Sequence, residues 1–115
     1  MGPLAEPKIV EKPWGREIWF AHTGDYAGKV LEVSAGKRLS LQKHAIKEET
    51  LYLLSGHITL TFGDEQFDWW PGMLVHIPTD TIHRFEAIED SVLLEVSTPH
   101  LDDVIRITDD YGRTD

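Results

Sequence analysis

The sequence predicts an all-β protein that folds as a single small barrel or sandwich. Apolar and polar residues alternate through most of the chain, and turn residues interrupt the alternation every six to ten positions or so. The 115 residues provide enough chain for one domain. Many short strands at regular spacing are typical of a closed β-barrel or of a β-sandwich. An immunoglobulin-like sandwich is the main alternative from the pattern alone.

Eight segments have the alternation or the apolar content expected of strands. They are residues 29–34, 39–44, 50–54, 57–62, 66–69, 73–77, 83–87 and 91–97. Glycines at 36, 56, 63 and 72 mark turns between them. A short helix is expected only at residues 101–104, after Pro99. We expect residues 1–12 to form an N-terminal arm, which pairs with a neighbouring subunit or stays mobile, and residues 13–115 to form the barrel domain.

The composition excludes several classes of protein. The chain has no cysteine, so any metal must be bound by imidazole, carboxylate or amide groups. The formal net charge of −9 opposes binding to nucleic acid. No run of about 18 apolar residues and no signal-peptide core is present, so we expect no membrane segment and a cytoplasmic location.

Polar side chains that can bind a metal occur at strand positions. Alternate residues of a strand share a face. One face of residues 38–44 therefore carries Arg38, Ser40, Gln42 and His44, and the other carries Leu39 and Leu41. Glu49 begins the next apolar strand, and His83 begins a later one. Two imidazoles, a carboxylate and an amide oxygen form a plausible ligand set for one divalent metal ion.

The spacing of these residues resembles the two motifs of the cupin superfamily. The first, G-x5-H-x-H-x3,4-E-x6-G, matches Gly36, Gln42, His44, Glu49 and Gly56; the second, G-x5-P-x-G-x2-H-x3-N, matches Gly72, Pro78, Asp80 and His83. Gln42, Asp80 and Ala87 depart from the pattern. The resemblance implies a cupin-type double-stranded β-helix, or jelly-roll barrel, whose metal is bound by Gln42, His44, Glu49 and His83.

A closer resemblance is to the cupin domain of type II mannose-6-phosphate isomerases, which often follows a mannose-1-phosphate guanylyltransferase domain. It rests on Leu-Ser-Leu-Gln-x-His at residues 39–44, Lys-Pro-Trp-Gly at 12–15, Ile-His-Arg at 82–84 and the closing motif at 102–113. It implies interconversion of mannose 6-phosphate and fructose 6-phosphate with one divalent metal per chain. Zinc is favoured over manganese, cobalt, nickel or iron. Ala45 and Ile46 replace histidines of the bifunctional enzymes, which leaves the substrate open.

Isomerisation of a sugar phosphate also needs a cationic clamp and a base. Lys37, Arg38 and Arg84 lie within a few residues of a predicted ligand and are the candidates for the clamp. Strict alternation places Arg38 on the ligand face, whereas the resemblance favours Arg84. The sequence does not assign the base, for which His57, His76, Glu48 and Lys43 are the candidates.

The partners expected are a small phosphorylated sugar and a second copy of the chain. Trp69 and Trp70 are adjacent in a strand, so one ring must face away from the barrel interior. Cupins of this size are usually dimers, and the apolar face of Leu39 and Leu41 agrees with a homodimer. Two other functions stay open: a non-catalytic cupin that binds a metal or small ligand, and a cupin dioxygenase. A basic pocket beside the metal favours the isomerase, whereas a dioxygenase should have an apolar one.

Overall fold

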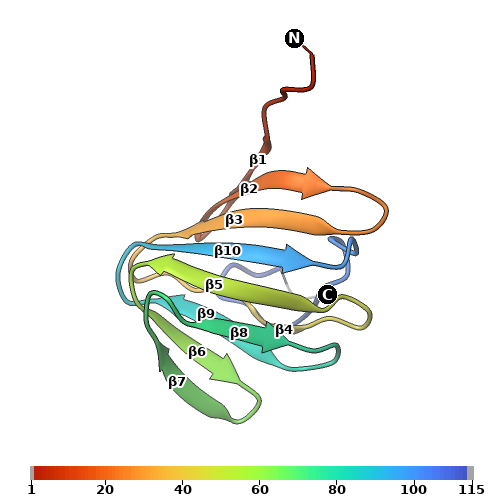
Figure 1. The fold of residues 1–115 in the computed structure, drawn as a ribbon. Coiled ribbons are helices and arrows are strands. Elements are labelled where there is room, and N and C mark those ends of the chain that lie inside the picture. Colours follow the sequence, from red (N-terminus) through yellow and green to blue (C-terminus); the bar gives the residue numbers. More distant parts are fainter. Residues whose placement is uncertain (1, 114–115) are drawn as a thin grey trace.

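The computed structural model describes residues 2–113, which fold into a two-layered antiparallel β-barrel (Figure 1). One sheet has the strand order β1-β2-β3-β10-β5-β8 and the other has the order β11-β4-β9-β6-β7. The first sheet consists of β1 (Lys8–Lys12), β2 (Gly15–His22), β3 (Ala27–Val33), β10 (Ser91–Ser97), β5 (Glu49–Ser55) and β8 (Leu74–Ile77). The second consists of β11 (Ile105–Thr108), β4 (Leu41–Lys43), β9 (His83–Ala87), β6 (Ile58–Phe62) and β7 (Glu65–Trp69). The predicted all-β jelly roll is confirmed.

All eight predicted strands are present, with differences of a few residues at their ends. Three strands were not predicted: β1, β2 and β11. Each of them has a charged side chain that lines the interior cavity, Lys12 in β1, Glu17 in β2 and Arg106 in β11, where an inward position usually carries an apolar residue. In β11, Ile105 and Ile107 are exposed while Arg106 lines the interior cavity. Apolar and polar residues alternate regularly in this strand, but the alternation predicts the wrong face as the buried one.

The predicted helix at residues 101–104 is wrong, and no helix occurs within residues 2–113. The backbone N–H of Leu101 donates to the carbonyl of Pro99, and that of Asp103 to the carbonyl of His100. A segment this short gains too few helical hydrogen bonds to offset the cost of nucleation. It forms a turn, which Asp103 uses to contact the loop after β4. None of these described residues belongs to a helix that could cross a membrane.

The core lies between the two sheets. Its fully buried side chains include Leu51, Leu53, Ile58, Ile77, Phe85 and Leu93. Trp69 is 3% exposed and Trp70 is 50% exposed, so the prediction that the two rings face opposite sides is confirmed. Leu39 is also in the core, and its predicted place on an outer face with Leu41 is wrong. The reason is local: the chain makes an isolated bridge at Arg38 and resumes strand geometry only at β4, so side-chain alternation is not kept between them.

Two turn positions explain part of the motif spacing. Gly56 has φ +96°, and a Cβ there would lie 2.2 Å from Oγ of Ser91, so the chain must approach closely without a side chain. Asp80 stands where the general motif has glycine, and it has φ +61°. Aspartate tolerates this left-handed conformation better than most residues. Its N–H donates to the carbonyl of His44 at 2.6 Å, so the substitution preserves the turn beside the metal ligands.

The N-terminal segment is partly ordered by pairing. Residues 8–12 of the predicted arm form β1, which pairs with β2 from Lys8↔Trp19 to Lys12↔Gly15. Residues 2–7, which precede β1, extend away from the barrel and are exposed (Figure 1). Pairing of this arm with a neighbouring subunit stays a prediction, as does the homodimer.

Candidate metal centre

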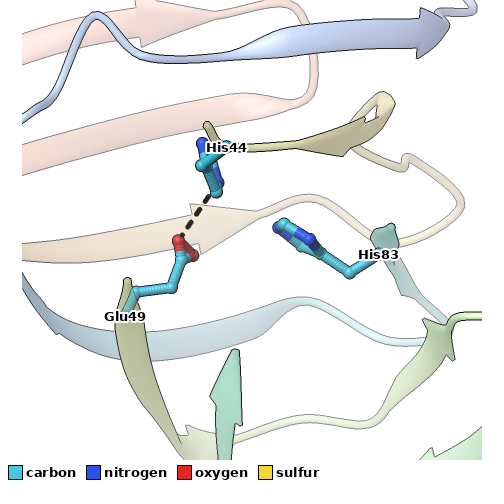
Figure 2. A group of neighbouring side chains, drawn as sticks. All are labelled: His44, Glu49 and His83. Carbon is cyan, nitrogen blue, oxygen red and sulfur yellow. Dashed lines mark ion pairs between the residues drawn. The ribbon is translucent and has the colours of Figure 1, made fainter. Parts of the chain in front are cut away.

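Three side chains that can bind a metal converge inside the barrel (Figure 2). His44 directly follows β4, Glu49 is the first residue of β5, and His83 is the first residue of β9. One ligand atom from each side chain can be chosen so that all three atoms lie within 4.8 Å of one another. All three residues are buried, with at most 3% of their surface exposed. The predicted ligands from distant parts of the sequence are thus brought together at one point.

Hydrogen bonds orient both imidazoles toward the shared point. Nδ1 of His44 lies 2.5 Å from the carbonyl oxygen of Asp103, and Nδ1 of His83 lies 2.8 Å from that of Thr81. Because a carbonyl only accepts, each Nδ1 carries the proton and donates, which leaves the Nε2 lone pair free. Histidine ligands are commonly oriented in this way by a second partner.

The inward atoms are left without a hydrogen-bond partner. Within residues 2–113, Nε2 of His44, Nε2 of His83 and Oε2 of Glu49 are all buried and make no hydrogen bond, although Oε2 of Glu49 lies 3.2 Å from Nζ of Lys47. Nε2 of His44 and Oε2 of Glu49 are 3.3 Å apart, without hydrogen-bond geometry. Buried unpaired polar atoms are costly, and three of them meeting at one point call for a shared partner. Two imidazoles and a carboxylate fit a divalent transition metal.

The protonation states also suit a metal ligand set. Burial opposes ionisation of Glu49, but contact with His44 and the positive charge of Lys47 outweigh it and lower its pKa to about 2. Burial lowers the pKa of His83 and so favours its neutral form. An ionised carboxylate and a neutral imidazole are the forms that bind metal.

A buried lysine links the site to a second carboxylate. Nζ of Lys47 lies 3.2 Å from Oε2 of Glu49 and 3.0 Å from Oε2 of Glu95. Burial and the negative charge of Glu49 raise the pKa of Glu95. Although burial opposes it, the charges of both carboxylates raise the pKa of Lys47. Lys47 is therefore charged and holds Glu49 and Glu95 in place.

Gln42 lies beside this group. It is the register partner of His83 across β4 and β9, and it lines the same cavity as His44 and Glu49. Its Oε1 accepts a hydrogen bond of 2.6 Å from the Ser40 hydroxyl, which fixes the amide. Its role as the fourth ligand stays a prediction.

The loop from His44 to Glu49 is anchored by Asp103. Its carboxylate accepts hydrogen bonds from the backbone N–H groups of Ala45, Ile46 and Lys47, at 3.1, 2.6 and 2.8 Å. The side chains of Ala45 and Ile46 are exposed. The two residues that replace histidines thus contribute backbone contacts, while Asp103 fixes the position of His44.

A cavity of about 660 Å³ opens beside the site, within the size range of small-molecule pockets. Gln42, His44 and Glu49 form part of its wall. The three predicted clamp residues are not among the residues that line it. Arg38 forms a two-bonded ion pair with Asp110, Arg84 donates to the carbonyls of Leu39 and Thr108, and Lys37 is exposed at a turn.

The histidines considered as bases also lie elsewhere. His57 stacks on Trp70, with ring centroids 3.9 Å apart, and contacts Asp68. His76 pairs with Glu48 at 2.8 Å. The two histidines are absent from the cavity wall, as are Glu48 and Lys43, and Lys43 instead forms an ion pair with Asp80.

Charged residues that sequence reasoning did not select line the cavity. They include Lys12, Glu17, Lys29, Glu95, Arg106 and Arg113. A signal was available for two of them: Lys29 shares a strand face with Leu31, and Glu95 shares one with Leu93, so each places a charge at an inward position. Nζ of Lys29 contacts Oε1 of Glu17 at 3.0 Å.

Comparisons with known proteins identify relatives of the chain. It is 33% identical to the alginate biosynthesis protein AlgA of Pseudomonas aeruginosa in an alignment 111 residues long, which covers 91% of this chain and 23% of that protein. It is 31% identical to a mannose-1-phosphate guanylyltransferase of Klebsiella pneumoniae, over 90% of this chain and 23% of that protein. The chain thus spans about a quarter of the length of these relatives.

Solved structures share the fold at low sequence identity. KdgF from Halomonas sp. superposes with a TM-score of 0.75 at 21% identity, over 83% of this chain and 90% of that one. An RmlC-like cupin from Shewanella frigidimarina superposes with a TM-score of 0.73 at 11% identity, over 81% and 84%. These similarities confirm the cupin fold.

The family model described as mannose-6-phosphate isomerase C-terminal matches residues 4–109. This range contains the four predicted ligands and all eleven strands of the barrel. The chain therefore belongs to the family of cupin domains related to the C-terminal part of mannose-6-phosphate isomerase.

Proposed function

We propose that this domain is a metal-dependent sugar-phosphate isomerase that interconverts mannose 6-phosphate and fructose 6-phosphate. The observation that carries the proposal is the buried group His44, Glu49 and His83, whose inward atoms make no hydrogen bond within residues 2–113. Two of the three, His44 and Glu49, line a polar cavity. Family membership supports the choice of substrate class. Two alternatives are separated by the test below: a non-catalytic metal-binding cupin and a cupin dioxygenase.

His44, Glu49 and His83 would hold one divalent metal, with Gln42 as the fourth ligand. When bound, the metal supplies a Lewis acid that polarises the sugar's C1 or C2 oxygen and stabilises the negative charge formed there. Zinc is favoured for a site with two imidazoles and one carboxylate, with manganese, cobalt, nickel and iron as alternatives.

The isomerisation moves one carbon-bound proton from C2 of the aldose to C1 of the ketose. We assign this transfer to Glu95, a buried carboxylate in the cavity wall that is not a predicted metal ligand. Its carboxylate takes the proton from C2, the C2–H electron pair forms the C1–C2 double bond, and the C1=O pair moves onto O1. The hydroxyl proton of O2 passes to O1, the C2=O bond forms from the O2 electron pair, and the C1–C2 pair takes the carbon-bound proton back from the Glu95 carboxyl group at C1. Burial raises the pKa of Glu95, which makes it a stronger base than an ordinary carboxylate.

Lys47 assists this step by holding the carboxylates of Glu49 and Glu95 on either side of its ammonium group. Glu17 is a less suitable base. Although burial opposes it, the charge of Lys29 and the hydrogen bond from Trp19 lower the pKa of Glu17.

The test is a coupled assay of fructose 6-phosphate formation from mannose 6-phosphate, with zinc, manganese or cobalt, together with elemental analysis of the purified protein. Activity with a stoichiometric metal, lost in His44→Ala, supports the proposal. His76→Ala is the matched control, because this imidazole is half-exposed outside the cavity. Stoichiometric metal without conversion would contradict the isomerase and favour the non-catalytic cupin. Consumption of oxygen with an apolar substrate would favour the dioxygenase.

A further inference from the structure

The cavity wall carries more positive charge than the rest of the chain. Six of its lining residues are Lys or Arg and five are Asp or Glu, whereas the whole chain has a formal net charge of −9. Local cations of this kind can determine the charge of the ligand that a pocket accepts. Only the cations without an ion pair are available to a ligand.

Three of these six cations are already neutralised by ion pairs. Lys29 pairs with Glu17, Lys47 pairs with Glu49 and Glu95, and Arg113 forms a two-bonded ion pair with Asp109. Lys8 is exposed and lies over the ring of Trp19, 4.8 Å from its centroid.

Lys12 and Arg106 differ from the others. Within residues 2–113 neither side chain has an ion pair or a hydrogen bond, and Nε of Arg106 is buried without a partner. Burial lowers the pKa of Lys12, and although the negative charge of Glu17 opposes this, the positive charges of Lys29, Arg106 and Arg113 add to it. Two unpaired cations close together in a cavity are unfavourable unless an anion lies between them.

The position of Arg106 is also unusual for its strand. β11 turns this guanidinium into the cavity and leaves Ile105 and Ile107 44% and 42% exposed, the reverse of the orientation that hydrophobic burial favours. Its register partner is Gln42, which pairs in turn with His83. Arg106 is therefore two strand spacings, about 10 Å, from the metal ligand His83 along the sheet. A six-carbon sugar with a terminal anionic group is of the length needed to reach both.

We infer that Lys12 and Arg106 form an anion-binding subsite that holds the phosphate monoester of the substrate while the other end of the sugar reaches the metal ligands. This inference rests on the proposed isomerase and replaces Lys37, Arg38 and Arg84 as the clamp. A guanidinium and an ammonium together match the charge and hydrogen-bonding geometry of a phosphate group.

The experiment is calorimetric titration of the metal-loaded protein with mannose 6-phosphate, mannose and mannuronate, alongside KM and kcat. Wild type should bind mannose 6-phosphate at least about tenfold more tightly than mannose. Lys12→Gln and Arg106→Gln should each lower this ratio of affinities by about tenfold. Arg106→Lys should restore part of it. Lys37→Gln, an exposed lysine outside the cavity, is the matched control and should bind like wild type.

The outcomes separate this inference from the proposed isomerase. Preferential binding of mannose 6-phosphate that depends on Lys12 and Arg106, without conversion, would leave the subsite standing and reject the isomerase. Conversion whose KM is unchanged in both variants would reject the subsite alone. Tighter binding of mannuronate than of mannose 6-phosphate would show that the subsite prefers a carboxylate to a phosphate, and this would overturn the inference. Metal content and thermal unfolding of each variant establish that the barrel is intact.

Discussion

The two ends of the cavity are built in opposite ways. At the metal end, His44, Glu49 and His83 are buried and oriented by hydrogen bonds to the backbone or by Lys47. At the cationic end, Lys12 and Arg106 are only partly buried, and among residues 2–113 their side chains have no ion-pair or hydrogen-bond partner. The first end is preorganised for a small ion that needs fixed geometry. The second can adjust to a larger anionic group, because long side chains without partners can move toward it.

The largest effect that separates the ends is expected from His44→Ala. Loss of a residue that merely orients a metal ligand weakens binding by about 10- to 100-fold, so loss of the ligand itself should cost more than about 100-fold in metal affinity. Metal titration with a competing chelator measures this. Inorganic phosphate should still bind to the variant through Lys12 and Arg106, and its complete loss would contradict the independence of the two ends.

Glu95→Gln is expected to act on the chemical step. The substitution keeps the shape of the side chain but removes the base, so kcat should fall by about 100-fold or more while KM changes little. Steady-state kinetics at saturating metal provide the measurement. Glu65→Gln, an exposed carboxylate on β7, is the control. An equal fall in kcat for both variants, or none for Glu95→Gln, would remove Glu95 as the base.

Asp103→Ala should have an intermediate effect confined to the metal end. It releases three backbone N–H groups of the loop that carries His44, and metal affinity should fall by about tenfold. The preference for mannose 6-phosphate over mannose should stay close to that of wild type. Asp64→Ala, in an exposed turn, serves as the comparison. Unchanged metal affinity would show that the loop holds its position without this anchor.

The smallest effect is a pH dependence of the metal-free protein. The pKa of Glu49 is about 2 in the folded chain and 4.5 for the free group, so the folded state favours the ionised form. Its contribution to the free energy of unfolding is complete above pH 4.5 and is lost as the pH falls toward 2. Urea unfolding of wild type and Glu49→Gln at pH 5 and pH 3 should show wild type losing more stability than the variant. A larger loss in the variant would contradict the assignment.

The site residues that could be predicted are those that the nearby sequence identifies by its spacing. His44, Glu49 and His83 stand at fixed intervals from turn residues such as Gly36, Gly56 and Gly72, and those intervals are visible along the chain. Lys37, Arg38 and Arg84 are the clamp residues that the sequence predicts, because they lie close to the predicted ligands along the chain. Closeness along the chain does not place them in the cavity, because neighbouring residues of a strand face opposite sides. A cation can also form an ion pair elsewhere, as Arg38 does with Asp110.

The sequence by itself determined the all-β barrel, eight of its eleven strands and three candidate metal ligands that converge in the fold, because alternation and turn chemistry are local properties. Only the tertiary structure decided which charges face the cavity. Lys12 reaches it through the pairing of β1 with β2, and Arg106 through the pairing of β11 with β4. Both pairings depend on contacts between distant segments, and in β11 they overcome the hydrophobic pattern that would have turned the isoleucines inward.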